Sequence, residues 1–343
     1  MIWVRSARWC AAKLLATVLT LAATTAPAPA QTLQDLKCTG NPGIPWDVQV
    51  AGCTDAINSA KFGGQNLATI FVNRGIAYAA MDDLDHAVAD YGEAIRLDPN
   101  YVAAFVDRGI AYRAKGDLDR AIADDDQAIR LNPNDLFAYT ARGAAYQAKG
   151  DLDPAIADFD QAIRLDPKAA AAFANRGLAY QSKGDLDRAI ADYNEAIRLV
   201  PNNAVAYYNR GNAYSAKRDF DHAIADYDQA IRLNPALTLA LNNRGVSYFA
   251  KKDYDHAIAD YNQAIGLDPT FAVAFNNRGR AYLAKKDYGH AIADYDQAIR
   301  LNPDYATALY WRGKAKQQNG DIAGGNADVS AAEKINPNIA APR

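Results

Sequence analysis

Residues that build catalytic and metal-binding sites are scarce in this sequence. Its 343 residues include only 4 histidines and 3 cysteines. The histidines stand at least 34 residues apart, too far for a short metal-ligand motif; they are His86, His222, His256 and His290. A glycine-rich phosphate loop, a cysteine cluster and a nucleophile elbow are also missing. The sequence therefore predicts no catalytic residue, no metal and no cofactor, and so a protein that is not an enzyme.

An apolar run long enough to span a membrane is lacking as well. The stretch at positions 14–23 is too short to cross roughly 30 Å of hydrocarbon. Basic residues precede it, and the small residues Ala28 and Ala30 follow it. This layout predicts a secretory signal peptide over residues 1–30, with Gln31 as the mature N-terminus; an uncleaved anchor is the alternative. We expect an exported protein, periplasmic or else secreted, without stable membrane insertion after cleavage.

Blocks of positive charge are absent too. The 37 lysines and arginines are outnumbered by 40 aspartates and glutamates, which gives a net charge of −3. Cleavage of the signal peptide would remove further positive charge. Because nucleic acids and anionic membranes select basic surfaces, neither is expected as a partner. The expected partner is a protein or an extended peptide.

Cysteine usage points to a single crosslink. Cys10 lies within the predicted signal peptide, so only Cys38 and Cys53 remain in the mature chain. An even pair in an exported protein predicts a disulfide, which would stabilise the fold by roughly 3 kcal/mol. Two free thiols are the alternative.

What the sequence does contain is a repeat of 34 residues. The dipeptide Arg-Gly recurs at this interval, at Arg74, Arg108, Arg142, Arg176, Arg210, Arg244, Arg278 and Arg312. Proline recurs at the same interval, at Pro99, Pro133, Pro167, Pro201, Pro235, Pro269, Pro303 and Pro337. A fixed period of this length indicates structural units stacked in a row.

Each unit is predicted to form two helices. In the first unit, Phe71 and Tyr78 fall on one face of a first helix. Asp83 is placed to cap a second helix, whose apolar face includes Tyr91. Pro99 then forces the chain out of the helix.

The repeated positions carry a resemblance. Their series resembles the tetratricopeptide (TPR) signature: Gly75, Tyr78, Ala87, Tyr91, Ala94 and Pro99. The resemblance implies an all-α, right-handed superhelical solenoid of helix-turn-helix repeats, with first helices lining a concave groove and second helices outside. The segment from Cys53 to Ile57, with the Asn-Arg-Gly repeats after it, resembles exported TPR proteins of alphaproteobacteria.

The predicted order is a terminal cap followed by eight repeats. The cap covers residues 31–67 and holds the expected disulfide. The repeats are 68–101, 102–135, 136–169, 170–203, 204–237, 238–271, 272–305 and 306–339. The last repeat is degenerate, because Lys316, Gly325 and Val329 replace its usual tyrosine, alanine and second aromatic residue.

A charged pair accompanies every repeat. Arg74 and Asp90 stand 16 residues apart, and each repeat keeps this pair. We expect a salt bridge within the repeat; the alternative is a row of arginines available to an acidic partner. Asp125 departs from the pattern, since it takes the place of an aromatic residue. Arg108 or Arg142 could neutralise it, or it is a weak spot.

The predicted binding surface follows from the resemblance. The first helices would present apolar residues in the N-terminal half, namely Val72, Ile76, Val106, Ile110 and Phe137. They would present polar and basic ones in the C-terminal half, namely Tyr208, Asn212, Asn276, Arg280 and Tyr310. One position carries asparagine in five repeats, at Asn73, Asn175, Asn209, Asn243 and Asn277.

This asparagine series resembles the ladder in the TPR groove of O-linked N-acetylglucosamine transferase. Asparagine offers a donor and an acceptor and can hold an extended backbone whatever its side chains; common TPR usage is the alternative. We therefore expect a non-enzymatic scaffold or adaptor that binds an extended peptide or protein segment in the groove. The alternative is a self-associating scaffold of the cell envelope, a homo-oligomer.

Overall fold

The computed structural model describes residues 37–339, and every helix and turn below lies in that range. The predicted signal peptide falls outside it. The described chain is all-α and contains no strand. Its helices are α3 (Trp46–Asn58), α4 (Gly64–Ala80), α5 (Leu84–Leu97), α6 (Val102–Lys115), α7 (Leu118–Leu131), α8 (Leu136–Lys149), α9 (Leu152–Leu165), α10 (Ala170–Ser182), α11 (Leu186–Leu199), α12 (Ala204–Ala216), α13 (Phe220–Leu233), α14 (Thr238–Ala250), α15 (Tyr254–Leu267), α16 (Ala272–Ala284), α17 (Tyr288–Leu301), α18 (Ala306–Gln318) and α19 (Ile322–Ile335).

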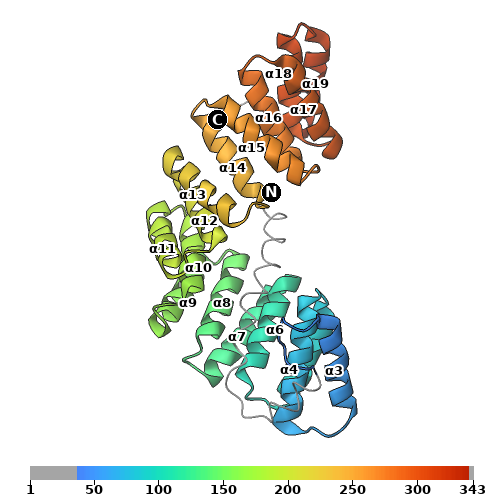
Figure 1. Cartoon of the computed structure of the whole chain (residues 1–343), viewed down its shortest axis with the longest axis vertical. Coiled ribbons are helices and arrows are strands. Elements are labelled where there is room, and N and C mark those ends of the chain that lie inside the picture. The colour runs from blue at the N-terminus through green and yellow to red at the C-terminus, as the bar shows by residue number, and fades with distance from the viewer. Residues whose placement is uncertain (1–36, 340–343) are drawn as a thin grey trace. The chain divides into compact units, whose positions relative to one another are not determined.

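The helices are arranged as the repeats of a solenoid (Figure 1). Within the two units described below, a first helix pairs with the second helix that follows it, as in α4 with α5, α6 with α7, α8 with α9, α12 with α13, α14 with α15, α16 with α17 and α18 with α19. The chain divides into two compact units, one ending at Ala179 and the other beginning at Tyr180, within α10. We refer to them as the N-terminal and C-terminal units. None of the helices in residues 37–339 combines the length and the apolar character that crossing a bilayer requires.

The second helices begin at an aspartate. The Asp83 side chain accepts a hydrogen bond from the His86 backbone N–H at 3.3 Å, which confirms the predicted cap. Asp151 is the exception and makes no such bond. The reason is local, because Pro154 occupies the capping-donor position and has no backbone N–H.

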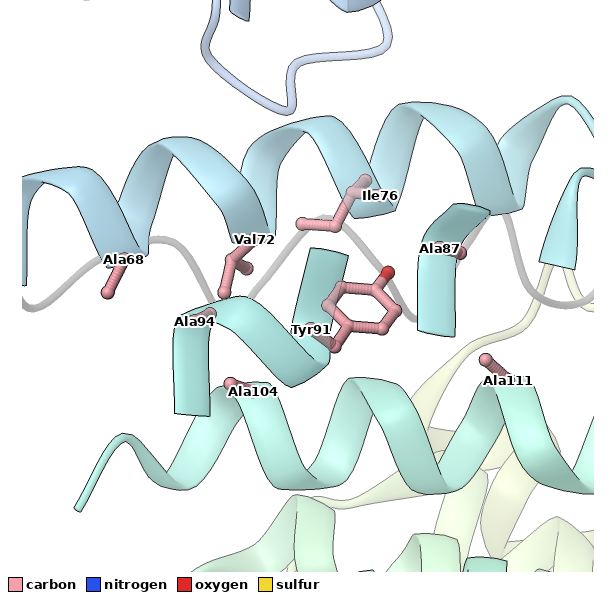
Figure 2. Packing of buried hydrophobic residues seen from close by; sticks show 8 residues of the cluster. All are labelled: Ala68, Val72, Ile76, Ala87, Tyr91, Ala94, Ala104 and Ala111. Carbon is pink, nitrogen blue, oxygen red and sulfur yellow. The ribbon is translucent and has the colours of Figure 1, made fainter. Parts of the chain in front are cut away.

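Close helix crossings depend on small residues opposite large rings. Tyr91 is only 1% exposed, and a Cβ atom on Gly75 would lie 2.6 Å from its ring. Figure 2 shows Tyr91 and Ala94 of α5 held between α4 and α6, the first helix of the next repeat. A repeat therefore completes its core only against its neighbour, as expected of a solenoid.

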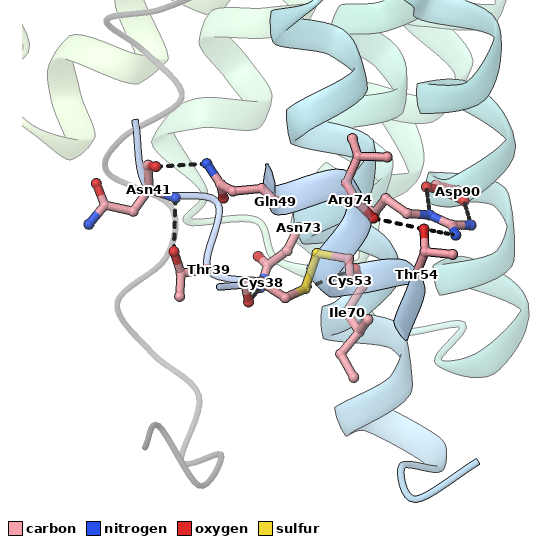
Figure 3. The surroundings of a disulfide bond; sticks show 11 residues. Cys38, Thr39, Asn41, Gln49, Cys53, Thr54, Ile70, Asn73, Arg74 and Asp90 are labelled. Atoms are coloured by element: carbon pink, nitrogen blue, oxygen red, sulfur yellow. Dashed lines mark hydrogen bonds and ion pairs between the residues drawn. A yellow bond between two sulfur atoms is a disulfide. The ribbon is translucent and has the colours of Figure 1, made fainter. Parts of the chain in front are cut away.

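The N-terminal cap is built around the predicted disulfide, which is present between Cys38 and Cys53 (Figure 3). Both cysteines are fully buried and pack with Ala56 and Ile70. The helix that carries Cys53, α3, packs against α4 as the second helix of a preceding repeat would.

Candidate functional site

In seven of the eight repeats, an arginine on the first helix binds an aspartate on the second helix. Arg74 donates from Nε and Nη2 to the Asp90 carboxylate at 2.7 and 2.8 Å (Figure 3). The same fork joins Arg108–Asp124, Arg142–Asp158, Arg210–Asp226, Arg244–Asp260, Arg278–Asp294 and Arg312–Asp328. The predicted salt bridge is confirmed in these seven repeats. In the fourth repeat, Arg176 lies in the N-terminal unit and its predicted partner Asp192 lies in the C-terminal unit.

Most of these arginines also reach back to the preceding repeat, which sequence reasoning missed. Arg142 donates from Nη1 to Asp126 at 2.6 Å, and Arg244 does the same to Asp228 at 2.6 Å. Equivalent bonds join Arg176–Asp160, Arg210–Asn194, Arg278–Asn262 and Arg312–Asp296. The signal was an aspartate or asparagine that recurs two residues after the paired aspartate in the second to seventh repeats, but not in the first or the last. Five arginines therefore bind acceptors both in their own repeat and in the preceding one, namely Arg142, Arg210, Arg244, Arg278 and Arg312. We refer to the paired arginines and aspartates, with these additional acceptors, as the ionic frame.

The apolar residues predicted for the N-terminal surface belong largely to the core. Val72, Ile76 and Val106 are 4%, 8% and 6% exposed, and Ile110 and Phe137 are half-buried against a neighbouring cluster. The first asparagine of the series is covered as well. Asn73 donates from Nδ2 to the Cys38 carbonyl oxygen at 3.0 Å (Figure 3).

Two buried acids distinguish the second repeat. Asp107 replaces asparagine in the ladder series and is 9% exposed; burial raises its pKa to about 7. Asp125 is 1% exposed, and neither of its carboxylate oxygens has a hydrogen-bond partner in residues 37–339. Burial raises the pKa of Asp125 well above its usual range, and the nearby Asp124 adds to this effect.

The counter-charge of Asp125 comes chiefly from Arg113, which sequence reasoning did not identify. Arg113 lowers the pKa of Asp125 most among the nearby cations, followed by Arg142, one of the two predicted residues. Arg108, the other, is engaged with Asp124. In the fourth repeat the position of Arg113 is Gln181, which accepts a hydrogen bond from Tyr193 at 2.9 Å. Arginine and aspartate thus replace a glutamine and tyrosine pair.

In the C-terminal unit, asparagine side chains form a connected chain across three first helices. Asn276 of α16 donates to Asn277 at 3.4 Å, and Asn277 donates to Asn242 of α14 at 3.0 Å. Asn242 donates to Asn243 at 3.0 Å, and Asn243 donates to Asn212 of α12 at 2.9 Å. This amide chain is a single polar network that the sequence showed only as separate positions.

The amide chain ends on tyrosine hydroxyls and is partly accessible. Asn243 also donates to the Tyr208 hydroxyl at 3.2 Å, and Tyr227 donates to Asn212 at 2.8 Å. Asn242 and Asn276 are buried, whereas Asn243, Asn277, Asn212 and Tyr208 are half-buried. Of the remaining predicted asparagines, Asn175 lies in the N-terminal unit and Asn209 in the C-terminal unit, and both are half-buried.

Beside the amide chain lies a stack of rings and cations. The Arg280 guanidinium lies 5.1 Å from the Phe249 ring centroid and 5.9 Å from that of Trp311. Tyr310 meets Trp311 edge-to-face at 5.3 Å, and Lys314 Nζ lies 5.3 Å from the Tyr310 ring. The predicted Arg280 and Tyr310 therefore share one surface.

The four histidines serve their own repeats. His86 stacks on Tyr78 at 5.0 Å, and its Nδ1 lies 2.8 Å from Asp83. The other three are placed in the same way, on Tyr214, Tyr248 and Tyr282. Within residues 37–339, no group of three or more potential ligands could hold a metal ion.

Comparison with protein families gives a consistent match. The family model described as "TPR repeat" matches residues 109–150, 148–184, 180–218 and 279–320. The model described as "Tetratricopeptide repeat" matches residues 68–101, 204–237 and 238–271. Together they cover more than half of the chain. No curated protein sequence matches it significantly.

Several solved structures have folds similar to that of this chain. A tetratricopeptide repeat protein from Parabacteroides merdae has 18% identity and a TM-score of 0.55, and the match covers 73% of this chain and 98% of that one. The pilF structure from Pseudomonas aeruginosa has 18% identity and a TM-score of 0.53, over 59% and 92%. The Cut9–Hcn1 hetero-tetramer of the APC/C has 17% identity and a TM-score of 0.52, over 98% and 92%. At these identities the likeness shows the fold alone.

Proposed function

Because this chain belongs to the tetratricopeptide-repeat family, we propose that it is a non-enzymatic scaffold that binds an extended peptide or protein segment along its first helices. Stacked repeats present extended surfaces, and such a surface within either unit suits a ligand that is itself extended. The proposal further places the protein outside the cytoplasm, which the disulfide supports. Free thiols at Cys38 and Cys53 in protein isolated under alkylating conditions would contradict that placement.

The amide chain is the observation that carries the proposal. The ionic frame satisfies its own charges between helices, so it leaves few donors for a partner. The asparagines instead hydrogen-bond to one another through neutral side chains, of which those of Asn212, Asn243 and Asn277 are half-buried. A peptide backbone presents the same amide donors and acceptors, so it can replace these bonds at little cost in free energy. Affinity from such contacts depends weakly on the peptide's side chains.

A displayed peptide library, selected on the full chain, tests this function. We expect selected peptides to bind about a hundredfold more weakly when Asn209, Asn243 and Asn277 are all replaced by alanine, since each lost pair of backbone contacts costs about 1 kcal/mol and the three costs add to about 3 kcal/mol. Circular dichroism of the triple variant should still show the native helix content.

The matched control replaces three exposed asparagines of the inter-repeat turns, Asn100, Asn134 and Asn202. This variant should bind the selected peptides as the unmodified chain does. Failure to select any peptide would contradict the proposed function. Equal binding by the triple variant would show that the asparagines do not contribute.

A further inference from the structure

Arg280 differs from the paired arginines of the first helices, because no carboxylate within residues 37–339 forms an ion pair with it. It is exposed on α16, and within the described part of the chain it makes neither an ion pair nor a hydrogen bond. The arginine two residues before it, Arg278, is bound by Asp294 and Asn262. Lys314 on α18 likewise has no ion pair with residues 37–339. This surface therefore carries two cations, Arg280 and Lys314, and neither has an ion-pair partner in the described part of the chain.

The side chains beneath Arg280 supply no negative charge. Burial raises the pKa of the Tyr261, Tyr295 and Tyr305 hydroxyls, and the positive charge of Arg280 only partly offsets this effect. All three hydroxyls are therefore neutral at physiological pH. Arg280 thus lies over uncharged phenols, and its charge is left for a partner.

The ring contacts hold the guanidinium ready to bind. Phe249 and Trp311 contact it from the first helices on either side, at 5.1 and 5.9 Å from their ring centroids. A stacked guanidinium keeps the N–H groups of its edge, which match a carboxylate in a two-pronged hydrogen bond. Less side-chain entropy is lost on binding, because the rings already restrict the arginine.

We name this surface the Arg280 subsite; its members are Phe249, Arg280, Tyr310, Trp311 and Lys314. We propose that the Arg280 subsite binds a peptide segment that carries an acidic side chain next to an aromatic or apolar one. The inference rests on the function proposed above and specifies the class of peptide. The carboxylate would meet Arg280 or Lys314, and the apolar side chain would pack on the exposed parts of the rings.

The position of the subsite favours a peptide over a nucleic acid. Asn277 of the amide chain precedes Arg280 by three residues on α16, so both lie on one face of that helix. A bound peptide can therefore meet backbone-binding amides and the cationic subsite together. A nucleic acid backbone carries no amide groups, so it could not pair with the asparagines of the amide chain in this way.

Fluorescence anisotropy with two labelled synthetic peptides tests the proposal on the full chain. One peptide alternates glutamate with phenylalanine, and the other has glutamine in place of glutamate. The acidic peptide should bind about tenfold more tightly, an advantage that Arg280→Ala should abolish and that high salt should reduce. Arg280→Lys should restore only part of it, because lysine keeps the charge but loses the fork and the stacking.

The control variant is Arg300→Ala. Arg300 is an exposed arginine of the same unit that donates to Gln297 on a second helix, and its loss should leave both affinities unchanged. Equal binding of the two peptides, or an unaltered preference in Arg280→Ala, would overturn the subsite while leaving the proposed function intact. If neither peptide binds and the library also yields none, both proposals fail.

Two further readouts separate other occupants. Sedimentation velocity should show that Arg280→Ala leaves the oligomeric state unchanged; conversion of a dimer to a monomer would assign the subsite to a second copy of this chain. A labelled single-stranded DNA oligonucleotide should not compete with the acidic peptide. Competition abolished by Arg280→Ala would overturn the proposed class of partner.

Discussion

The N-terminal and C-terminal units contain the same type of arginine–aspartate pair, but different residues occupy the same face of their first helices. In the N-terminal unit, the cap covers Asn73, and the next position of that series is the buried acid Asp107. In the C-terminal unit, Asn243 and Asn277 belong to the amide chain, with the Arg280 subsite beside it. The residues of the core and of the ion pairs are therefore nearly the same in every repeat, whereas the residues on this face of the first helices vary.

The largest expected effect tests whether the frame is the same in both units. Asp158 and Asp260 are equivalent frame residues, with side chains 8% and 4% exposed. Asp158→Ala and Asp260→Ala should each lower the free energy of unfolding by about 3–5 kcal/mol, because each leaves a mostly buried arginine without its main partner. Urea denaturation followed by circular dichroism measures the loss.

Exposed aspartates on second helices of the same two units give the control for this pair. Asp119 and Asp255 bind lysines at the surface with side chains 83% and 81% exposed, so their replacement by alanine should cost less than about 1 kcal/mol. A large loss of unfolding free energy in only one of the two variants would contradict this expectation, since it would mean that the ionic frame stabilises the two units unequally.

A smaller effect, of a few kcal/mol at most, should distinguish the N-terminal unit by its pH dependence. The pKa of Asp107 is about 7 in the folded protein, raised by burial from 3.8. Between pH 4 and 7 the folded state therefore holds a proton that the unfolded state has lost. Stability should fall as pH rises through this window, by up to about 1.4 kcal/mol per pH unit, and the contribution of Asp107 should be constant above it.

Asp107→Asn isolates that contribution, because asparagine occupies the position in five other repeats. The variant should be more stable than the unmodified chain at pH 8, and the difference should shrink toward pH 4. Denaturation curves at several pH values provide the measurement. A difference that stays constant with pH would contradict the assignment of a raised pKa to Asp107.

The smallest expected effect concerns Asp125, one of the two buried acids of the second repeat. Exchanging Asp125 for tyrosine and Arg113 for glutamine would reproduce the pair Tyr193 and Gln181 of the fourth repeat. The change removes two carboxylate oxygens that lack hydrogen bonds, and it should raise the free energy of unfolding by roughly 1–3 kcal/mol. Thermal denaturation of the double variant checks this; a lower midpoint would mean that the second repeat has adapted its packing to the charged pair.

The sequence alone was enough to predict the features that lie within one repeat. The 34-residue period predicts the helix pairs, and the invariant spacing of Arg74 and Asp90 predicts their salt bridge. The cap by Asp83 and the disulfide between Cys38 and Cys53 follow from residue type and position. The helix pairs, the salt bridge and the cap depend on local rules that apply within a repeat, and the disulfide follows from the two cysteines that remain in the cap.

Features between repeats could not be read in the same way. The bond from Arg142 to Asp126, the link from Asn277 to Asn242 and the stacking of Arg280 on Trp311 join neighbouring repeats. Their geometry depends on how far one repeat is rotated against the next, and the spacing of residues within a repeat does not contain that offset. The covering of Asn73 by the cap depends on a loop that has no counterpart in the repeats.

We propose that the first-helix face of the C-terminal unit binds an extended acidic peptide. Titration of the nitrogen-15-labelled chain with the glutamate–phenylalanine peptide, followed by side-chain NMR signals, is the sharpest test of this proposal. We expect shifts for the side-chain amides of Asn209, Asn243 and Asn277 and for Nε–H of Arg280, with Asn73 and Asn134 unmoved. Shifts confined to the second helices, or no shifts at a saturating peptide concentration, would contradict it.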